Sequence, residues 1–236
     1  MSDTPAYPQT PRSRARRKPT RARYDEASVY AVLDAAVLCH VGYVIEGQPF
    51  VTPTAFWREG RRLYWHGSAA SRMIRAQASG LPVCVTVSHL DGLVLAASGI
   101  AHSANYRSVM AFGRARLVEG LEARRAALEA FIDRLYPGRA ETLRPMTDKE
   151  VLQVGLIEMT IEEAVAKQRA GGVNLLPEDE GWPVWTGVLP VSMQVGRPMV
   201  EAASASDARP GAGFEPYAEG ERLDDALSQA ARIWAA

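Results

Sequence analysis

The chain has 236 residues, of which 47% are hydrophobic and 23% charged, a balance typical of a globular protein with a substantial core. No apolar run approaches the ~20 residues that span a bilayer, and the N-terminus lacks the apolar segment of a secretory signal. The only cysteines, Cys39 and Cys84, lie far apart and form no CxxC pair, which argues against a disulfide framework and a zinc knuckle. We therefore expect a cytoplasmic protein with no membrane partner.

The charges are unevenly distributed, although the formal net charge is zero. Residues 1–23 contain seven basic side chains and one acid, so the rest of the chain has 20 basic and 26 acidic groups. Because this segment is also rich in Pro, Ser and Thr, we predict a disordered basic tail over residues 1–23. A basic arm that binds a partner is the alternative, but the acidic remainder disfavours strong nucleic-acid binding.

The first predicted elements are one helix and a series of short strands. Residues 24–36 have a helical pattern that Asp25 can cap. Tight turns at residues 46–48 and 58–61 predict hairpins between the strands that follow. The predicted strands cover residues 37–45, 49–57, 62–66, 82–88, 93–97 and 106–118.

The second half of the chain begins with a predicted amphipathic helix over residues 120–136, which ends at Pro137-Gly138. Thr147 and Glu150 form a capping box that predicts a short helix. A strand over residues 155–166, an irregular segment at 182–187, a linker at 204–216 and a last helix at 221–234 follow. Short strands joined by tight turns predict a mainly β protein with flanking helices, an antiparallel barrel over residues 24–200, followed by a linker and helix over 201–236.

The stretch LYWHGSAASRMIRAQ places polar residues where a strand passes into a helix. Hydroxyl groups and an arginine around a helix start are typical of a phosphate site. An ordinary serine cap followed by a surface arginine explains the same residues. A second polar cluster, HSANYRSV at residues 102–109, begins an apolar strand; it could bind a ligand or simply cap backbone groups.

Common catalytic motifs are missing from the sequence. The four histidines show no metal-ligand spacing such as HExxH, and there is no GxSxG, GxxxxGK[ST] or GxGxxG motif. We therefore predict no metal site and identify no catalytic residue.

Three segments together resemble the pyridoxamine 5′-phosphate oxidase-related flavoproteins, and most of all their nitroimidazole-reductase-like, flavin-nucleotide-binding branch. They are VLCHVGYVIEGQPFVTPTAFWREGRRLYWHGSAASRM, DGLVLAASGIAHSANYRSVMAFGRARLV and VWTGVLP, and the similarity covers about residues 24–200. The sequence departs from the family pattern at Ala97 and Ala101, where relatives have an arginine and a second histidine.

The resemblance implies an FMN-binding split β-barrel that works as a homodimer, with the flavin between the subunits. It assigns the phosphate to the HGS…SR block, the flavin ring and ribityl chain to the VTPT run, and further contacts to the NYRS block and three later residues. The implied cofactor-binding residues are Val51, Thr52, Pro53, Thr54, His66, Gly67, Ser68, Ser71, Arg72, Asn105, Tyr106, Arg107, Ser108, Lys167, Arg169 and Trp185.

The function implied by the resemblance is that of an oxidoreductase that passes electrons from a reduced nicotinamide through FMN to a small organic acceptor. The alternatives are a flavin store or sensor without turnover, and a split barrel that holds heme or a deazaflavin instead. Oxidation of pyridoxamine 5′-phosphate and a basic-armed interaction protein rank below these.

Overall fold

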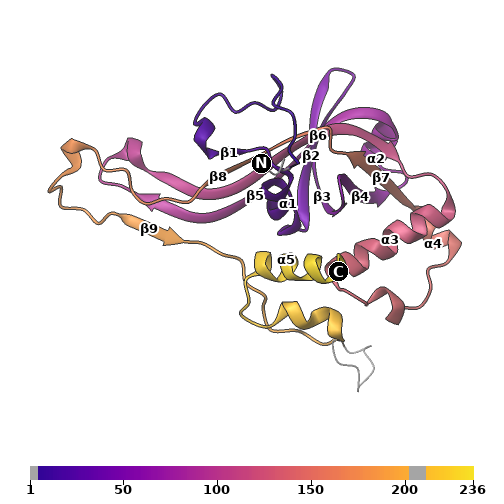
Figure 1. The fold of residues 1–236 in the computed structure, drawn as a ribbon. Helices are drawn as coiled ribbons and strands as arrows, with labels where there is room; N and C mark the ends of the chain where they lie inside the picture. The colour runs from indigo at the N-terminus through magenta and orange to yellow at the C-terminus, as the bar shows by residue number, and fades with distance from the viewer. Residues whose placement is uncertain (1–4, 202–210) are drawn as a thin grey trace.

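The computed structural model describes residues 5–201 and 211–236. Figure 1 shows a compact barrel from which a long, curved β-hairpin projects, while the C-terminal helix lies below both. The helices are α1 (Glu26–Asp34), α2 (Arg72–Gln77), α3 (Leu121–Leu135), α4 (Asp148–Gln153) and α5 (Leu223–Trp234). The strands are β1 (Ala22–Arg23), β2 (Leu38–Ile45), β3 (Gln48–Glu59), β4 (Arg62–Ser68), β5 (Ser79–Leu95), β6 (Ser103–Leu117), β7 (Val154–Thr160), β8 (Glu163–Arg169) and β9 (Gly187–Pro190).

Six strands close into a ring in the order β6–β7–β4–β3–β2–β5, and β5 pairs back to β6. All of these pairings are antiparallel. β8 and β1 extend the sheet from one side of β6, and β9 extends it from the far end of β5. This confirms the predicted mainly β barrel with flanking helices.

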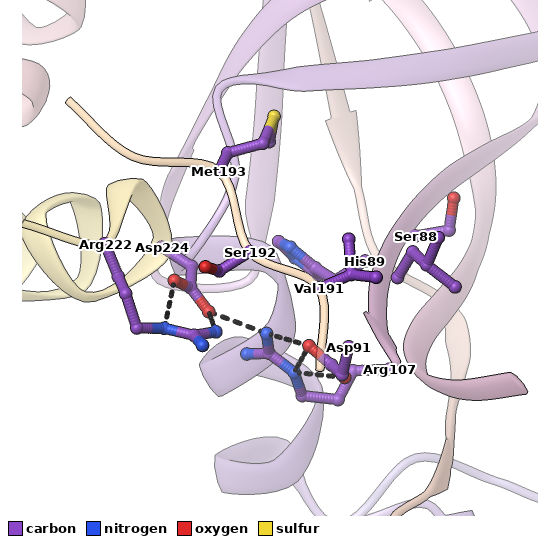
Figure 2. Close-up of a pocket in the computed structure, with 10 residues that line it drawn as sticks. Ser88, His89, Asp91, Arg107, Val191, Ser192, Met193, Arg222 and Asp224 are labelled. Atoms are coloured by element: carbon purple, nitrogen blue, oxygen red, sulfur yellow. Dashed lines mark hydrogen bonds and ion pairs between the residues drawn. The ribbon is translucent and has the colours of Figure 1, made fainter. Parts of the chain in front are cut away.

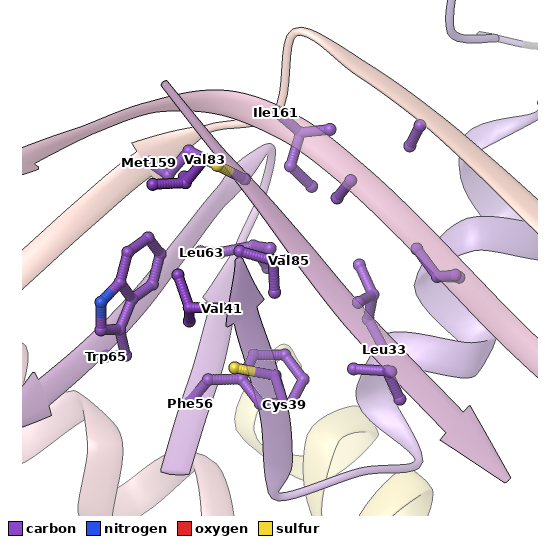
Figure 3. Packing of buried hydrophobic residues seen from close by; sticks show 14 of the residues in the cluster. Leu33, Cys39, Val41, Phe56, Leu63, Trp65, Val83, Val85, Met159 and Ile161 are labelled. Carbon is purple, nitrogen blue, oxygen red and sulfur yellow. The ribbon is translucent and has the colours of Figure 1, made fainter. Parts of the chain in front are cut away.

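The barrel interior is a single apolar cluster, in which alternate residues of each strand point inward. Figure 3 shows Phe56, Leu63, Trp65 and Met159 meeting there. The buried indole of Trp65 donates a hydrogen bond of 2.8 Å to Gln77 Oε1, so α2 is tied to the core through a polar contact. This contact fastens the C-terminal end of α2 to the middle of β4.

Two local caps agree with the sequence analysis. The Asp25 carboxylate accepts from the Ser28 amide at 2.8 Å and starts α1. Thr147 and Glu150 form the predicted capping box at the start of α4. The predicted linker at residues 204–216 lies partly outside the described residues.

The strand boundaries differ from the prediction in three places. β5 is one long strand, because Asp91-Gly92 forms a register shift opposite β6 rather than a turn. The predicted strand at 155–166 is the hairpin of β7 and β8. β9 begins at Gly187, the last residue of the segment expected to be irregular, and is ordered by pairing with Leu95 and its neighbours.

The N-terminal segment also differs from the predicted disordered tail, since residues 5–23 pack on the barrel. Tyr7 is buried and donates its amide to the Tyr24 carbonyl at 2.8 Å, and β1 pairs with β8. Arg12 forms ion pairs with Glu162 and Glu163, so the basic segment contacts an acidic part of the barrel surface. Composition alone could not reveal these non-local partners.

The C-terminal helix docks between α1 and α3. Its small side chains Ala226, Ala230 and Ala231 are buried with Leu227. Arg134 of α3 is 4% exposed and donates to the Leu227 carbonyl at 3.3 Å and the Asp34 carbonyl at 3.0 Å. The residues after 211 are therefore part of the folded unit.

Candidate functional site

The first block of predicted site residues comes together where the middle of β3, the end of β4 and the start of α2 meet. The Thr54 hydroxyl donates to the His66 carbonyl at 3.2 Å. The Ser71 hydroxyl accepts from the Ile74 amide at 3.2 Å, and the Ser68 hydroxyl accepts from the Ala70 amide at 3.3 Å. Each serine keeps its own O–H free to donate to a ligand. We call Thr54, Gly67, Ser68, Ser71 and Arg72 the cradle.

The serine cap and a ligand role are therefore compatible. α2 has only six residues, so its dipole contributes little, and the amides of Ala70, Ser71 and Ile74 already have hydrogen-bond partners. The cradle would rely mainly on hydroxyl groups and a guanidinium.

A glycine on β7 allows α2 to approach the barrel so closely. A Cβ at Gly155 would lie 2.4 Å from Ile74 Cγ2 and 3.1 Å from Ala69 Cα. The first distance is shorter than any real Cβ contact, so any side chain here would push α2 away. Gly155 thereby sets the position of the cradle, a role that the sequence analysis did not predict.

Arg72 is the cation of the cradle. Its guanidinium lies over the Phe50 ring, 4.2 Å from the centroid, and its side chain is exposed. No carboxylate among the described residues forms an ion pair with it. Stacking on Phe50 orients the guanidinium while its charge remains available for an anion.

The VTPT run lies beside the cradle on β3. Val51 is 67% exposed and Pro53 is exposed, whereas Thr52 points inward and shares a 3.0 Å hydrogen bond with the Tyr43 hydroxyl. The exposed residues could contact a ligand lying on the sheet, and the two threonines are held by contacts within the chain.

The His66 side chain points away from the cradle, so its predicted contact with a phosphate finds no support in the position of its ring. The ring packs edge-on against Phe131 of α3, with centroids 5.0 Å apart, and lies 6.3 Å from Trp57. Its Nδ1 atom is buried without a hydrogen-bond partner, and burial lowers the pKa of His66. The lowered pKa favours the neutral form of the imidazole.

A cavity of about 480 Å³ lies next to this ring, between α3, α4 and the start of β7. We call it the α3 cavity. Its lining is mainly apolar, with His66, Arg144 and Glu150 as the polar members. The apolar lining residues are Leu128, Phe131, Ile132, Leu143, Met146 and Val154.

The second block of predicted site residues gathers on β6 and β8. Asn105 accepts from Arg169 and from the Gly171 amide, and its own amide donates to the Gly171 carbonyl at 3.1 Å. The Ser108 hydroxyl donates to the Lys167 carbonyl at 3.2 Å, and Lys167 Nζ donates to the Arg17 carbonyl at 3.4 Å. This block is ordered by its own contacts.

Arg107 of the second block is turned to the C-terminal helix, as Figure 2 shows. Its guanidinium lies 2.7 Å from both Asp91 and Asp224, and these contacts raise the pKa of Arg107. Asp224 also meets Arg222 at 2.9 Å. We call these four residues the latch; a cavity of about 160 Å³ lies beside them. With both neighbouring carboxylates bound, Arg107 is not free to hold a phosphate.

The two blocks do not meet within one chain. Pro53 pairs with His40, His40 with Thr86, and Thr86 with Met110, so β2 and β5 separate the two blocks. Three strand spacings of about 4.8 Å place β3 and β6 roughly 14 Å apart. Trp185 lies still farther out; it is 63% exposed and its ring leaves no room for a Cβ at Gly187.

Paired residues on neighbouring strands share a face, and the outer face of β2, β3, β5 and β6 carries exposed apolar groups. Leu38, Val44, Val51 and Met110 are 60%, 52%, 67% and 41% exposed. A surface of this kind between the two blocks is typical of an interaction site.

Sequence reasoning also missed the latch carboxylates and the α3 residues. Asp91 and Asp224 lie far from each other in the sequence, so no local signal pairs them with Arg107. Within the described residues, no group of three or more His, Cys, Asp or Glu side chains could hold a metal ion. The helices of the same residues also lack the length and apolar character of a membrane-spanning helix.

The comparisons with known proteins agree with this fold. The family model for pyridoxamine 5′-phosphate oxidase matches residues 25–168. The structure of the flavocytochrome Anf3 from Azotobacter vinelandii is 40% identical, covers 91% of this chain and all of its own, and superposes with a TM-score of 0.83. The FAD and heme binding protein from Mycobacterium smegmatis is 31% identical, covers 86% of this chain and 98% of its own, and has a TM-score of 0.80. No curated protein matches the chain.

Proposed function

The chain belongs to the pyridoxamine 5′-phosphate oxidase family, and we propose that it binds a flavin nucleotide and transfers electrons. The cradle is the observation that carries the proposal. It combines an oriented arginine, which has no carboxylate partner among the described residues, with two hydroxyl groups just after the end of β4. A riboflavin phosphate needs this arrangement: a charge-assisted contact at one end and an open sheet face along its length.

The residues of the chain bind and orient, and the flavin supplies the redox chemistry, taking up or giving a hydride. Arg72 and the O–H groups of Ser68 and Ser71 hold the phosphate. Val51 and Pro53 present an apolar surface to the ring. The electron donor in this proposal is a reduced nicotinamide, and the acceptor is a small organic molecule.

The protein works as a homodimer in this proposal. Within one chain, the cradle lies about three strand spacings from the second block. The outer face of the sheet between them carries exposed apolar groups. A second copy on this face would bring its own Asn105 and Arg169 toward the first copy's cradle. Both halves of the site would then surround one flavin.

The bound flavin could be FMN or the longer FAD. The sequence resemblance implies FMN, whereas the relative from M. smegmatis is named for FAD. Both flavins carry the phosphate that the cradle would hold. Extraction of the bound flavin followed by chromatography distinguishes the two.

The test is an absorption spectrum of the purified protein, recorded anaerobically before and after addition of NADH or NADPH. We expect a flavin band that bleaches with the donor. A colourless protein that gives no spectral shift on titration with FMN or FAD would contradict flavin binding. A bound flavin that no nicotinamide reduces would favour the store or sensor.

We also propose a heme, because the two relatives are named as a flavocytochrome and as a FAD and heme binding protein. The fit can be judged from the residues present. The α3 cavity lies within the range of about 300–1,000 Å³ typical of cofactor sites, and it is mainly apolar with one histidine. These residues fit a heme, which would supply one-electron chemistry.

A further inference from the structure

The N-terminal segment carries a group of cations that flavin binding does not use. Residues 5–23 contain seven basic side chains and no acidic one. Five of the basic side chains form no ion pair with a carboxylate of the described residues, and these are Arg14, Arg16, Arg17, Lys18 and Arg21. All of them except Arg21 are exposed. We call these five residues the basic patch.

The backbone of the basic patch is ordered by contacts that do not involve its charges. The Ala15 amide donates to the Tyr24 hydroxyl at 2.9 Å, and the Arg17 carbonyl accepts from Lys167 Nζ at 3.4 Å. A short helical turn follows at Pro19–Arg21. The charged side chains therefore remain available to a partner, and the ordered backbone lowers the entropy cost of binding one.

The basic patch adjoins the second block of site residues. Lys167 of β8 pairs with Ala22 of β1 on one side and with Ser108 of β6 on the other. Two strand spacings of about 4.8 Å place Ala22 roughly 10 Å from Ser108. Figure 1 shows the N-terminal segment beside β1 and β8. In the proposed homodimer the second block lines the flavin, so a molecule bound to the basic patch would lie close to the redox centre.

The distribution of charge favours a compact acidic partner. Residues 24–236 carry 20 basic and 26 acidic side chains, so the basic patch is a local positive surface on an acidic body. A groove of about 490 Å³ lies within the basic patch; Arg14 and Arg16 line it, and it has no acidic lining residue. A compact protein with an acidic surface can contact the basic patch without approaching the acidic remainder of the chain.

Other polyanions fit the basic patch less well. Single-stranded nucleic acids stack their bases on aromatic side chains, and residues 8–23 contain none. A long duplex would also meet the acidic body. A membrane-binding segment needs large apolar side chains to insert between lipids, whereas the residues between the cations are Ala15, Pro19 and Thr20.

We propose that the basic patch docks a small acidic electron-transfer protein, which delivers electrons to the flavin. This inference rests on the proposed flavin function, and it adds a protein donor to the nicotinamide. A carrier of single electrons reduces one flavin fully in two encounters, with two protons taken from water. Five cations on one short segment form a small contact, and small interfaces are typical of electron-transfer encounters.

The test uses a reduced, acidic plant-type ferredoxin as the probe, because electrostatic steering depends on the charge of the partner more than on its fold. Anaerobic stopped-flow absorbance measures flavin reduction in the full-length protein, and calorimetry measures the affinity for the ferredoxin. Both are recorded between about 0.01 M and about 0.15 M salt, where the screening length falls from about 30 Å to about 8 Å. We expect the rate constant to fall by about tenfold or more over this range.

A pair of double variants separates the basic patch from the overall charge. Arg16→Gln with Arg17→Gln should lower the rate constant at low salt by about tenfold and flatten its salt dependence. Arg197→Gln with Arg232→Gln removes two exposed arginines outside the basic patch and changes the net charge equally, so the rate constant should stay near that of the wild type. Flavin content and oligomeric state should be the same in all three proteins.

The outcomes separate this inference from the proposed flavin function. A wild-type flavoprotein that is reduced by NADPH but neither binds ferredoxin nor accepts its electrons would overturn the inference alone. Equal losses in both double variants would reveal a general charge effect and overturn it as well. A colourless protein that binds ferredoxin through the basic patch would refute the flavin function and support the docking surface.

Two further results would assign the basic patch elsewhere. Loss of flavin from the Arg16 and Arg17 double variant would make the basic patch part of the flavin site and overturn the inference. A single-stranded DNA oligonucleotide or a phosphatidylserine vesicle that binds more tightly than the ferredoxin would overturn the choice of an acidic protein.

Discussion

Two arginines that sequence reasoning assigned to the same ligand have opposite surroundings. Arg72 lies over an aromatic ring with no carboxylate partner among the described residues, whereas Arg107 is held between two carboxylates. The first is available for an anion, and the second fastens the C-terminal helix to the hairpin. The difference teaches that an arginine in a family motif is a ligand candidate only if its charge is not already balanced.

The largest expected effect is the loss of flavin affinity on replacing Arg72. Arg72→Ala should weaken flavin binding by roughly 2–4 kcal/mol, because the phosphate loses its charge-assisted partner. Fluorescence titration with FMN and FAD measures it. Arg75→Ala, which removes an exposed arginine on the same helix, is the matched control and should bind normally. Full flavin occupancy of Arg72→Ala after dialysis would show that the cradle is misassigned.

The position of the cradle can be changed without altering its charge. Gly155→Ala introduces a Cβ against Ile74 and Ala69, and overpacking of this kind costs about 1–3 kcal/mol. We expect lower stability in urea together with weaker flavin binding. Gly196→Ala adds the same methyl group where no atom lies within 4 Å and the backbone is unstrained, so it should change neither property. Unchanged flavin affinity in Gly155→Ala would mean that α2 does not position the ligand.

The paired arginine should behave differently. Arg107→Ala leaves Asp91 and Asp224 without a shared partner, and because the group is partly exposed we expect a loss of about 1–2 kcal/mol in unfolding free energy. Flavin affinity should fall much less than in Arg72→Ala. The opposite result, with flavin affinity lost and stability unchanged, would make Arg107 a ligand residue.

The smallest expected effect is on the pH dependence of stability, to which Asp224 of the latch contributes. Burial opposes ionisation of Asp224, but hydrogen bonds from Arg222 and Arg107 outweigh it and lower the pKa of Asp224 to about 2. A lowered folded-state pKa gives stability that is present above the ordinary value of 3.8 and lost as the pH falls toward 2. The difference in unfolding free energy between wild type and Asp224→Asn should therefore be constant above about pH 5 and shrink between pH 4 and pH 2. A difference that does not change with pH would contradict the latch.

Several features of the fold could be predicted because they depend on neighbours in the sequence. Asp25 and Thr147 each accept a hydrogen bond from the backbone amide three residues later and so cap a helix. The turns at 46–48 and 58–61 join strands that pair with each other. Short strands joined by tight turns indicated the barrel class. The serine and arginine of the cradle were found in the same way, since they lie within one strand-to-helix junction.

Other features depended on contacts that no local pattern encodes. Arg107 and Asp224 are 117 residues apart, and the basic N-terminal segment is ordered by Glu162 and Glu163. The direction of the His66 ring is set by Phe131 and Trp57, which come from other elements. Local hydrogen bonds and side-chain periodicity act over a few residues, so the sequence by itself determined the elements and the candidate groups. Packing and charge pairing act across the whole fold, and only the tertiary structure decided which of those groups remain free to bind.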